Sequence, residues 1–138
     1  MNGFLLDTNV VSELAKRGKN PQVVEWVLNT PDCYLSILTL GEIKRGAWLH
    51  RNTDPRYTDR LFDWLRQLEA SYSDHTLAIN RDVMHAWASI PTRRTLPVIE
   101  GLLAATALAH DLTVATRNIR DFADTGVATF NPSAELLE

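Results

Sequence analysis

Short apolar runs alternate along this chain with longer segments whose apolar residues recur at helical spacing, and this alternation constrains the fold more than any other feature. Parallel strands need a crossover connection, usually a helix, so the alternation is typical of an α/β fold with a parallel sheet. No repeat, low-complexity tract or flexible linker interrupts the 138 residues, which is the size of one domain. We therefore predict a single α/β domain over residues 1–138. The expected strands are Phe4–Leu6, Tyr34–Leu38, Thr76–Ile79, Leu112–Ala115 and Val127–Phe130.

The segments between these strands predict helices. The helix from Arg81 is expected to turn Val83, Met84 and Trp87 inward. The helix from Gly101 is apolar on nearly all sides, so we expect it to be buried. The expected helices run from Thr8 to Gly18, Pro21 to Leu28, Thr39 to His50, Pro55 to Tyr72, Arg81 to Ile90 and Gly101 to His110, with a short one from Asn118 to Ala123.

Composition excludes several classes of protein. The formal net charge of −3 argues against strong non-specific binding to duplex DNA, which needs a basic surface. A single cysteine, Cys33, excludes an internal disulfide framework and CxxC metal motifs. The N-terminus lacks the basic head and apolar stretch of a signal peptide, and no apolar run is long enough to span a membrane. We therefore expect a cytoplasmic protein without a membrane partner.

Four acidic residues occupy equivalent places in this plan. Asp7 follows the first strand, and Glu42 lies in the first turn of the helix after the second strand. Glu100 stands at the start of the buried helix, and Asp121 lies in the short helix after the Leu112–Ala115 strand. The carboxyl ends of parallel strands meet at one edge of a sheet, so these acids are expected to converge. Clustered carboxylates repel one another, and a hard divalent cation offsets that cost. Mg²⁺ or Mn²⁺ held in this way can activate water against a phosphodiester, which makes hydrolysis of a phosphodiester the expected chemistry.

Each acid also has a purely structural interpretation. Asp7 can act as an N-cap, and Thr39 with Glu42 matches the S/T-x-x-E capping box. Glu100 and Asp121 can be first-turn acids that interact with a helix dipole. A carboxylate at the start of an almost wholly apolar helix needs a partner, however, so Glu100 favours the metal site.

Basic residues flank the expected site. Setting the four acids aside turns the formal charge of −3 into +1. The basic side chains can bind a phosphate backbone or can simply be solvated surface groups. They are Lys44, Arg45, Arg93, Arg94, Arg117 and Arg120.

Four segments, in order and over essentially the whole chain, resemble the motifs of PIN-domain proteins, in particular VapC- and FitB-type toxins of toxin–antitoxin pairs. The first segment, Leu5–Glu13, reads LLDTNVVSE, and the second, Tyr34–Glu42, ends in LTLGE. The third segment is Gly101–Ala107, directly after Glu100, and the fourth is Val114–Phe122. The ending Phe130–Pro132 is similar as well.

This resemblance implies a three-layer α/β/α sandwich and an endoribonuclease that uses Mg²⁺ or Mn²⁺ to cut RNA. It implies that Asp7 and Glu100 are the main direct metal ligands. It implies that Glu42 and Asp121 bind through water or a second metal, with Asn118 as an alternative to Asp121 at the fourth position. The supporting polar residues that it implies are Asn9, Ser36, Thr39, Thr116 and Asn118.

The resemblance also implies partners: a cognate antitoxin whose C-terminal segment blocks the site, a homodimer or toxin–antitoxin hetero-oligomer, and contact with DNA only through the antitoxin. One departure is Glu100, since relatives usually carry aspartate there. A longer side chain misplaces the carboxylate, so an impaired PIN protein that mainly binds its antitoxin is an alternative. A third hypothesis, a phosphatase- or nuclease-like metal enzyme acting on DNA or a small phosphate ester, is disfavoured by Asn9, where a phosphoaspartate mechanism has a second aspartate.

Overall fold

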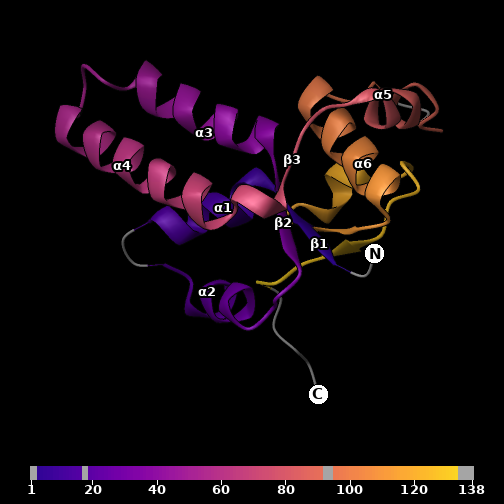
Figure 1. Ribbon diagram of the computed structural model, residues 1–138, viewed down its shortest axis with the longest axis horizontal. Helices are drawn as coiled ribbons and strands as arrows, with labels where there is room; N and C mark the ends of the chain where they lie inside the picture. The colour runs from indigo at the N-terminus through magenta and orange to yellow at the C-terminus, as the bar shows by residue number, and fades with distance from the viewer. Residues whose placement is uncertain (1–2, 17–18, 92–94, 134–138) are drawn as a thin grey trace.

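Five parallel strands form a central sheet in the order β3-β2-β1-β4-β5. The structure is a computed structural model that describes residues 3–16, 19–91 and 95–133 (Figure 1). The all-parallel pairing confirms the α/β fold. The strands are β1 (Phe4–Leu6), β2 (Cys33–Ser36), β3 (Thr76–Leu77), β4 (Thr113–Ala115) and β5 (Thr129–Phe130).

Helices connect the strands and cover both faces of the sheet. In Figure 1, α3 and α4 form an antiparallel hairpin on one side, α5 and α6 lie on the other, and α2 lies below. The helices are α1 (Thr8–Ala15), α2 (Pro21–Leu28), α3 (Ile37–Leu49), α4 (Pro55–Ser71), α5 (Arg81–Ala88) and α6 (Val98–His110), with short 3₁₀ turns η1 (Ser73–His75) and η2 (Ile119–Phe122).

Side chains of the central strands alternate between two separate cores. Leu6 and Leu35 pack with apolar residues of α1 to α4 on one face of the sheet. Leu5 and Val114 pack with Leu103 and other residues of α6 on the opposite face. Because successive strand residues point to opposite faces, one short buried strand serves both cores. The fold is therefore the expected three-layer α/β/α sandwich.

The strand register decides which residues meet at the carboxyl edge of the sheet. Leu6 of β1 pairs with Ala115 of β4, so the next residues along the chain, Asp7 and Thr116, leave the sheet side by side. On the other side of β1, β2 ends at Ser36. Two loops that lie more than a hundred residues apart in sequence are thus brought together at this edge.

The second strand and the helix that follows differ from the prediction. The strand ends at Ser36 rather than Leu38, because the Ser36 hydroxyl accepts a hydrogen bond from the Leu38 N–H (3.1 Å) and caps α3. The capping box of Thr39 and Glu42 is therefore wrong: Thr39 already lies inside the helix, and the first turn of α3 contains no acid. Competition from a stronger cap three residues earlier explains the shift.

The α5–α6 side differs from the prediction in how its side chains are buried. Val83 is fully buried, but Met84 and Trp87 are 45% and 47% exposed, so the inward orientation expected for Met84 is wrong. The Trp87 indole packs on Gly101, where an added Cβ would lie 3.2 Å from Nε1. The absence of a side chain at Gly101 therefore allows α5 to approach α6 closely.

Cys33 is the single cysteine of the sequence. Cys33 is buried in β2, and burial, with a smaller contribution from Asp32, raises the pKa of its thiol to about 12. The thiol therefore stays protonated and unreactive at neutral pH.

None of the helices in the described residues combines the length and the apolar character needed to cross a lipid bilayer.

Candidate functional site

Asp7 lies at the centre of the carboxyl edge of the sheet, directly after β1. Its side chain is 8% exposed. Oδ1 accepts a hydrogen bond from the Thr8 N–H (2.8 Å), and Oδ2 accepts one from the Thr116 hydroxyl (2.8 Å). The Asn9 amide also donates to Oδ2 (3.3 Å). Asp7 does stand at the N-cap position of α1, but the bonds from Asn9 and Thr116 orient it more tightly than capping requires.

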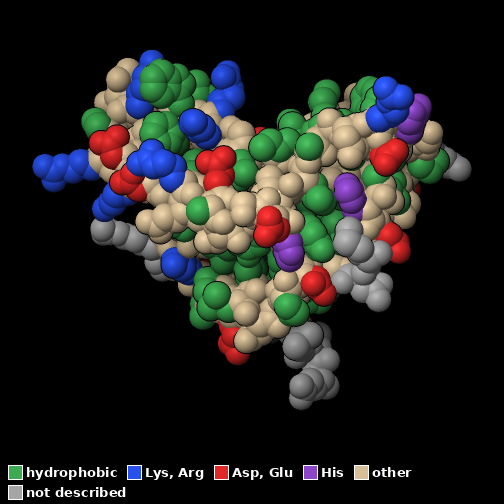
Figure 2. Space-filling model, viewed as in Figure 1, with side chains coloured by type: hydrophobic (Ala, Val, Ile, Leu, Met, Phe, Trp, Pro, Cys, Tyr) green, Lys and Arg blue, Asp and Glu red, His purple; other side chains and the backbone are tan. Residues whose placement is uncertain are grey.

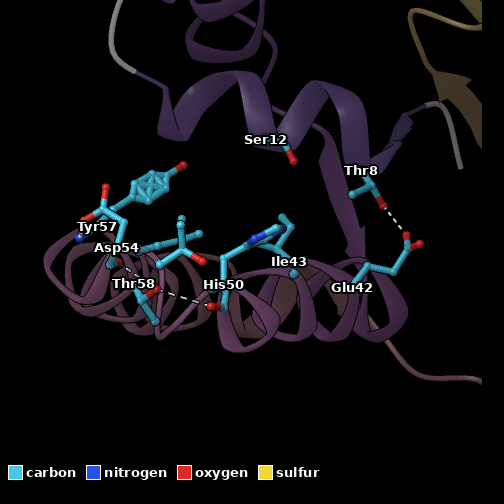
Figure 3. A pocket seen from close by; sticks show the side chains of 12 residues that line it. Thr8, Ser12, Glu42, Ile43, His50, Asp54, Tyr57 and Thr58 are labelled. Carbon is cyan, nitrogen blue, oxygen red and sulfur yellow. Dashed lines mark hydrogen bonds between the residues drawn. The ribbon is translucent and has the colours of Figure 1, made fainter.

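Glu42 is held beside Asp7 by a residue that the sequence analysis did not single out. The Thr8 hydroxyl donates a 2.6 Å hydrogen bond to Oε1 of Glu42, and so links α1 to α3 (Figure 3). Thr8 follows Asp7 directly and contacts both carboxylates, because its N–H donates to Asp7 and its hydroxyl donates to Glu42. The only sequence signal for this role was its place between Asp7 and Asn9 in the first motif.

Electrostatics show that three of the four expected acids converge. Burial raises the pKa of Asp7, hydrogen bonds from Thr116 and Thr8 lower it, and the nearby carboxylates of Glu100 and Glu42 raise it again. Glu100 stands in the first turn of α6, as expected, and is half-buried. Acidic side chains of α3 and α6 thus concentrate negative charge around the buried carboxyl group of Asp7.

The fourth acid occupies a different position. Asp121 lies in η2, and the loop from β4 to η2 lines a hollow of about 540 Å³ with Asp121, Asn118 and Asn131 at its surface. Asp121 is not among the groups that affect the pKa of Asp7. Asn118 is exposed, and its backbone N–H donates to the Thr116 hydroxyl (3.0 Å). The choice between Asp121 and Asn118 at the fourth position stays a prediction.

The supporting residues fall into two groups. Asn9 and Thr116 contact Asp7 directly and also each other (3.4 Å). Ser36 is fully buried and caps α3, which is a structural role. Thr39 is fully buried, and its hydroxyl finds no hydrogen-bond partner among the described residues.

Thr39 provides a stability prediction. A buried hydroxyl without a partner costs about 1–3 kcal/mol, so Thr39→Val is expected to raise the free energy of unfolding by about 1 kcal/mol in urea denaturation. Thr106→Val is the matched control, because the Thr106 hydroxyl is equally buried but donates to the Leu102 carbonyl (2.7 Å). Lower stability of Thr39→Val would show that the hydroxyl is satisfied in solution, in line with the supporting role expected for it.

The raised pKa of Asp7 predicts a pH dependence of stability. The folded state keeps the Asp7 proton to higher pH than the unfolded state, so stability falls as pH rises from about 4 through the raised folded pKa. Glu13, whose pKa is lowered, acts in the opposite direction, so wild type must be compared with Asp7→Asn. With a chelator present, the free energy of unfolding of wild type is expected to fall relative to that of Asp7→Asn as the pH rises through this range. A difference that does not vary with pH would contradict the prediction.

The donor atoms of this site fit a hard divalent cation. Asp7, Glu42 and Glu100 offer carboxylate oxygens, the ligands that Mg²⁺ and Mn²⁺ prefer. The buried, repelling carboxylates around Asp7 are also an arrangement that a cation stabilises. As the side chains are arranged, no three acidic, histidine or cysteine residues in the described part of the chain are close enough to hold a metal ion. Glu42 is an exposed side chain that can move toward a bound cation.

A groove extends from the acidic residues between α1 and the α3–α4 hairpin. It encloses about 500 Å³ and begins at Thr8 and Glu42. Figure 3 shows Ser12 of α1 facing Ile43 and His50 across it. The remaining lining residues, mostly small or apolar, are Gly46, Ala47, Thr53, Asp54, Tyr57, Thr58 and Leu61.

Basic side chains are unevenly distributed. Figure 2 shows Lys and Arg side chains gathered over the α3–α4 side, which a hollow separates from the α5–α6 side. Of the expected phosphate-binding residues, Lys44 and Arg45 are exposed on α3, next to Glu42. Arg117 instead pairs with Glu13 of α1 (3.2 Å). Arg93 and Arg94 lie outside the described residues.

Comparisons with known proteins agree with this fold. Residues 4–128 match the family model described as "PIN domain". The toxin FitB of Neisseria gonorrhoeae is 35% identical over 137 residues, which cover 94% of this chain and 97% of FitB. The VapC ribonuclease Y4jK of Sinorhizobium fredii is 28% identical over 138 residues, which cover 94% of this chain and 96% of that protein.

A solved structure is similar over the same extent. The crystal structure of FitAcB from Neisseria gonorrhoeae superimposes with a TM-score of 0.84 at 33% identity, covering 94% of this chain and 97% of that one. The family match spans strands β1 to β4 and the acidic residues Asp7, Glu42, Glu100 and Asp121. This protein therefore belongs to the PIN domain family and is related to toxins and ribonucleases of the FitB and VapC type.

Proposed function

We propose that this protein is the toxin of a toxin–antitoxin pair and a Mg²⁺- or Mn²⁺-dependent endoribonuclease. The observation that carries the proposal is Asp7, a buried carboxylate fixed by Thr116 and surrounded by Glu42 and Glu100 at the carboxyl edge of a PIN-family sheet. Relatives named toxin FitB and VapC ribonuclease support it. Exposed Lys44 and Arg45 beside Glu42 offer cations to an RNA backbone.

The residues of the site would have different roles in the reaction. A bound divalent cation supplies a Lewis acid that activates water and stabilises negative charge on the phosphoryl group. Asp7 and Glu100 would hold it. Glu42, retained near Asp7 by the Thr8 hydroxyl, would orient the attacking water. Thr116 and Asn9 keep the Asp7 oxygens in a fixed direction, since each donates to Oδ2.

The test is cleavage of a mixed pool of tRNA and structured RNA with Mg²⁺ or Mn²⁺, with EDTA as the metal-removal control. Metal binding is measured separately by calorimetry. Cleavage that EDTA abolishes, together with a specific divalent site, supports the ribonuclease. Single-stranded DNA and a generic phosphate ester, added as competitors, separate it from a phosphatase-like enzyme. A protein that binds no divalent cation would leave the antitoxin-binding PIN protein as the function.

Glu100 provides a prediction within the same assay. Its carboxylate extends about one bond beyond that of the aspartate usual in relatives, and a misplacement of about 1 Å can cost roughly 100-fold in rate. Glu100→Asp is expected to raise the rate with Mg²⁺ by roughly tenfold and to reduce any preference for Mn²⁺. Equal Mg²⁺ activity in wild type and Glu100→Asp would show that glutamate is fully competent at this position.

The antitoxin would bind in the groove between α1 and the α3–α4 hairpin. The groove is lined mainly by small and apolar side chains and ends at Thr8 and Glu42, so a segment lying in it reaches the acidic residues. A basic side chain at the end of such a segment would pair with the carboxylates in place of the metal ion. Among solved relatives, the structure of FitAB bound to a DNA fragment covers 98% of this chain at 32% identity. As the family resemblance implies, contact with DNA would come through the antitoxin.

A further inference from the structure

Glu13 is a buried carboxylate that lies outside the cluster of Asp7, Glu42 and Glu100. It stands on α1 and is 5% exposed. Oε1 accepts a hydrogen bond from the Asn20 N–H (2.8 Å), and Oε2 interacts with Lys16 Nζ and Arg117 Nη1, each at 3.2 Å. The bond from Asn20 and the interactions with Lys16 and Arg117 lower the pKa of Glu13, so it is a charged group at neutral pH.

Arg117 connects Glu13 to the loop that follows β4. Its backbone N–H donates to Oδ1 of Asn9 (3.2 Å), and its guanidinium pairs with Glu13. Asn9 and Glu13 are four residues apart, so they lie on the same face of α1. The turn that begins at Thr116 is therefore fastened to α1 at two points, once through the backbone and once through a side chain.

The same turn carries the hydroxyl that fixes Asp7. The Thr116 Oγ1 donates to Oδ2 of Asp7 (2.8 Å) and accepts the Asn118 N–H (3.0 Å). Asn9 contacts both partners, since its amide reaches Oδ2 of Asp7 and Oγ1 of Thr116. Any shift of Arg117 away from α1 would move Thr116 as well, because the two residues are adjacent.

We propose that Glu13 is a positioning residue of the acidic site: by pairing with Arg117 it holds the turn from Thr116 to Asn118 against α1 and keeps the Thr116 hydroxyl on Asp7. The proposal deepens the function proposed above and rests on it for the meaning of the site. Arg117 then pairs with a buried carboxylate instead of binding an RNA phosphate.

Lys16 provides a matched control for this role. It pairs with the same Oε2 of Glu13 at the same 3.2 Å, but it is the C-cap residue of α1, is 54% exposed and forms no hydrogen bond or ion pair with the turn among the described residues. If Glu13 only stabilised the end of α1, Lys16→Met and Arg117→Met would have similar effects. If Glu13 positions the turn, only Arg117→Met reproduces the effect of Glu13→Gln, a variant that keeps an acceptor for the Asn20 N–H.

The experiment compares wild type, Glu13→Gln, Arg117→Met, the double variant and Lys16→Met. Hydrogen exchange of the residue 117 and Asn118 amides is measured by NMR as a protection factor, and Mn²⁺ affinity is measured by calorimetry. A hydrogen bond to a charged group is strong enough that its loss should lower protection about tenfold. Changes in groups that orient a metal ligand typically weaken metal binding about 10–100-fold. The double variant should be no worse than either single variant, and Lys16→Met should match wild type.

Three results would overturn the proposal. Unchanged protection in Glu13→Gln would show that the turn does not depend on Glu13. Fully additive effects in the double variant would show that the two residues act separately. Weaker RNA binding with a flatter salt dependence in Arg117→Met but not in Glu13→Gln would make Arg117 a phosphate ligand. If wild type binds no Mn²⁺, the proposed function fails, and the exchange data alone still decide whether Glu13 holds the turn.

Discussion

Asp7→Asn is expected to reduce metal-dependent RNA cleavage by more than about 100-fold, since even outer-shell changes at metal sites typically cost about 10–100-fold. The same variant is expected to be more stable than wild type in the absence of metal. The amide keeps the shape of the carboxylate but removes a buried charge that Glu100 and Glu42 oppose. Activity and stability therefore change in opposite directions, which a purely structural residue would not show.

The measurements are initial rates of RNA cleavage with Mg²⁺ and Mn²⁺, and urea denaturation with and without Mn²⁺. Mn²⁺ should stabilise wild type but not Asp7→Asn, because a ligand that binds only the folded state raises its stability. Asp124→Asn is the control: Asp124 is exposed, and its φ of 68° suits asparagine. Retention of cleavage in Asp7→Asn, or equal stabilisation of both proteins by Mn²⁺, would remove Asp7 from the metal site.

Gly46→Trp is expected to weaken antitoxin binding by about 30-fold or more, the loss of about 2 kcal/mol that defines an interface hot spot. Gly46 lies in the middle of α3 and lines the groove, and an added Cβ would meet no atom within 4 Å. The indole can therefore occupy the space proposed for the antitoxin without disturbing the core. Glycine inside a helix is unfavourable, so the fold should not be weakened.

Gly41→Trp is the matched control for this variant. Gly41 is also in α3 and also has no atom within 4 Å of an added Cβ, but it does not line the groove. Affinity for the cognate antitoxin is measured by calorimetry, and RNA cleavage is followed in parallel. Gly46→Trp should keep wild-type cleavage and escape inhibition by the antitoxin. Equal affinities of the two tryptophan variants would place the antitoxin elsewhere on the surface.

Much of the fold could be predicted from the sequence because its signals are local. Short β-rich runs and helical spacing predicted the strands and helices to within a few residues, as for α4, predicted from Pro55 to Tyr72 and found at Pro55–Ser71. One error, at the start of α3, has a local cause. Two hydroxyl residues, Ser36 and Thr39, compete to cap one helix, and the first of them does so.

The candidate site could be predicted only in part. The positions of the acids, after strands or at the starts of helices, predicted convergence, and the structure brings the charges of Glu42 and Glu100 to bear on Asp7. Pattern alone did not indicate how the acids are held. Thr8, which binds Glu42, is an unremarkable helix residue in sequence, and the inward orientation expected for Met84 failed because α5 leaves that side exposed.

The sequence by itself determined the α/β class, the order of strands and helices along the chain, and the residues that carry negative charge. These follow from hydrophobic periodicity and residue type, which depend only on neighbours in the chain. The tertiary structure decided the strand order, the pairing of Leu6 with Ala115 and hence the meeting of Asp7 with Thr116. It also decided that Glu13 pairs with Arg117, 104 residues away. Such contacts depend on which strands become neighbours, and no local pattern encodes that choice.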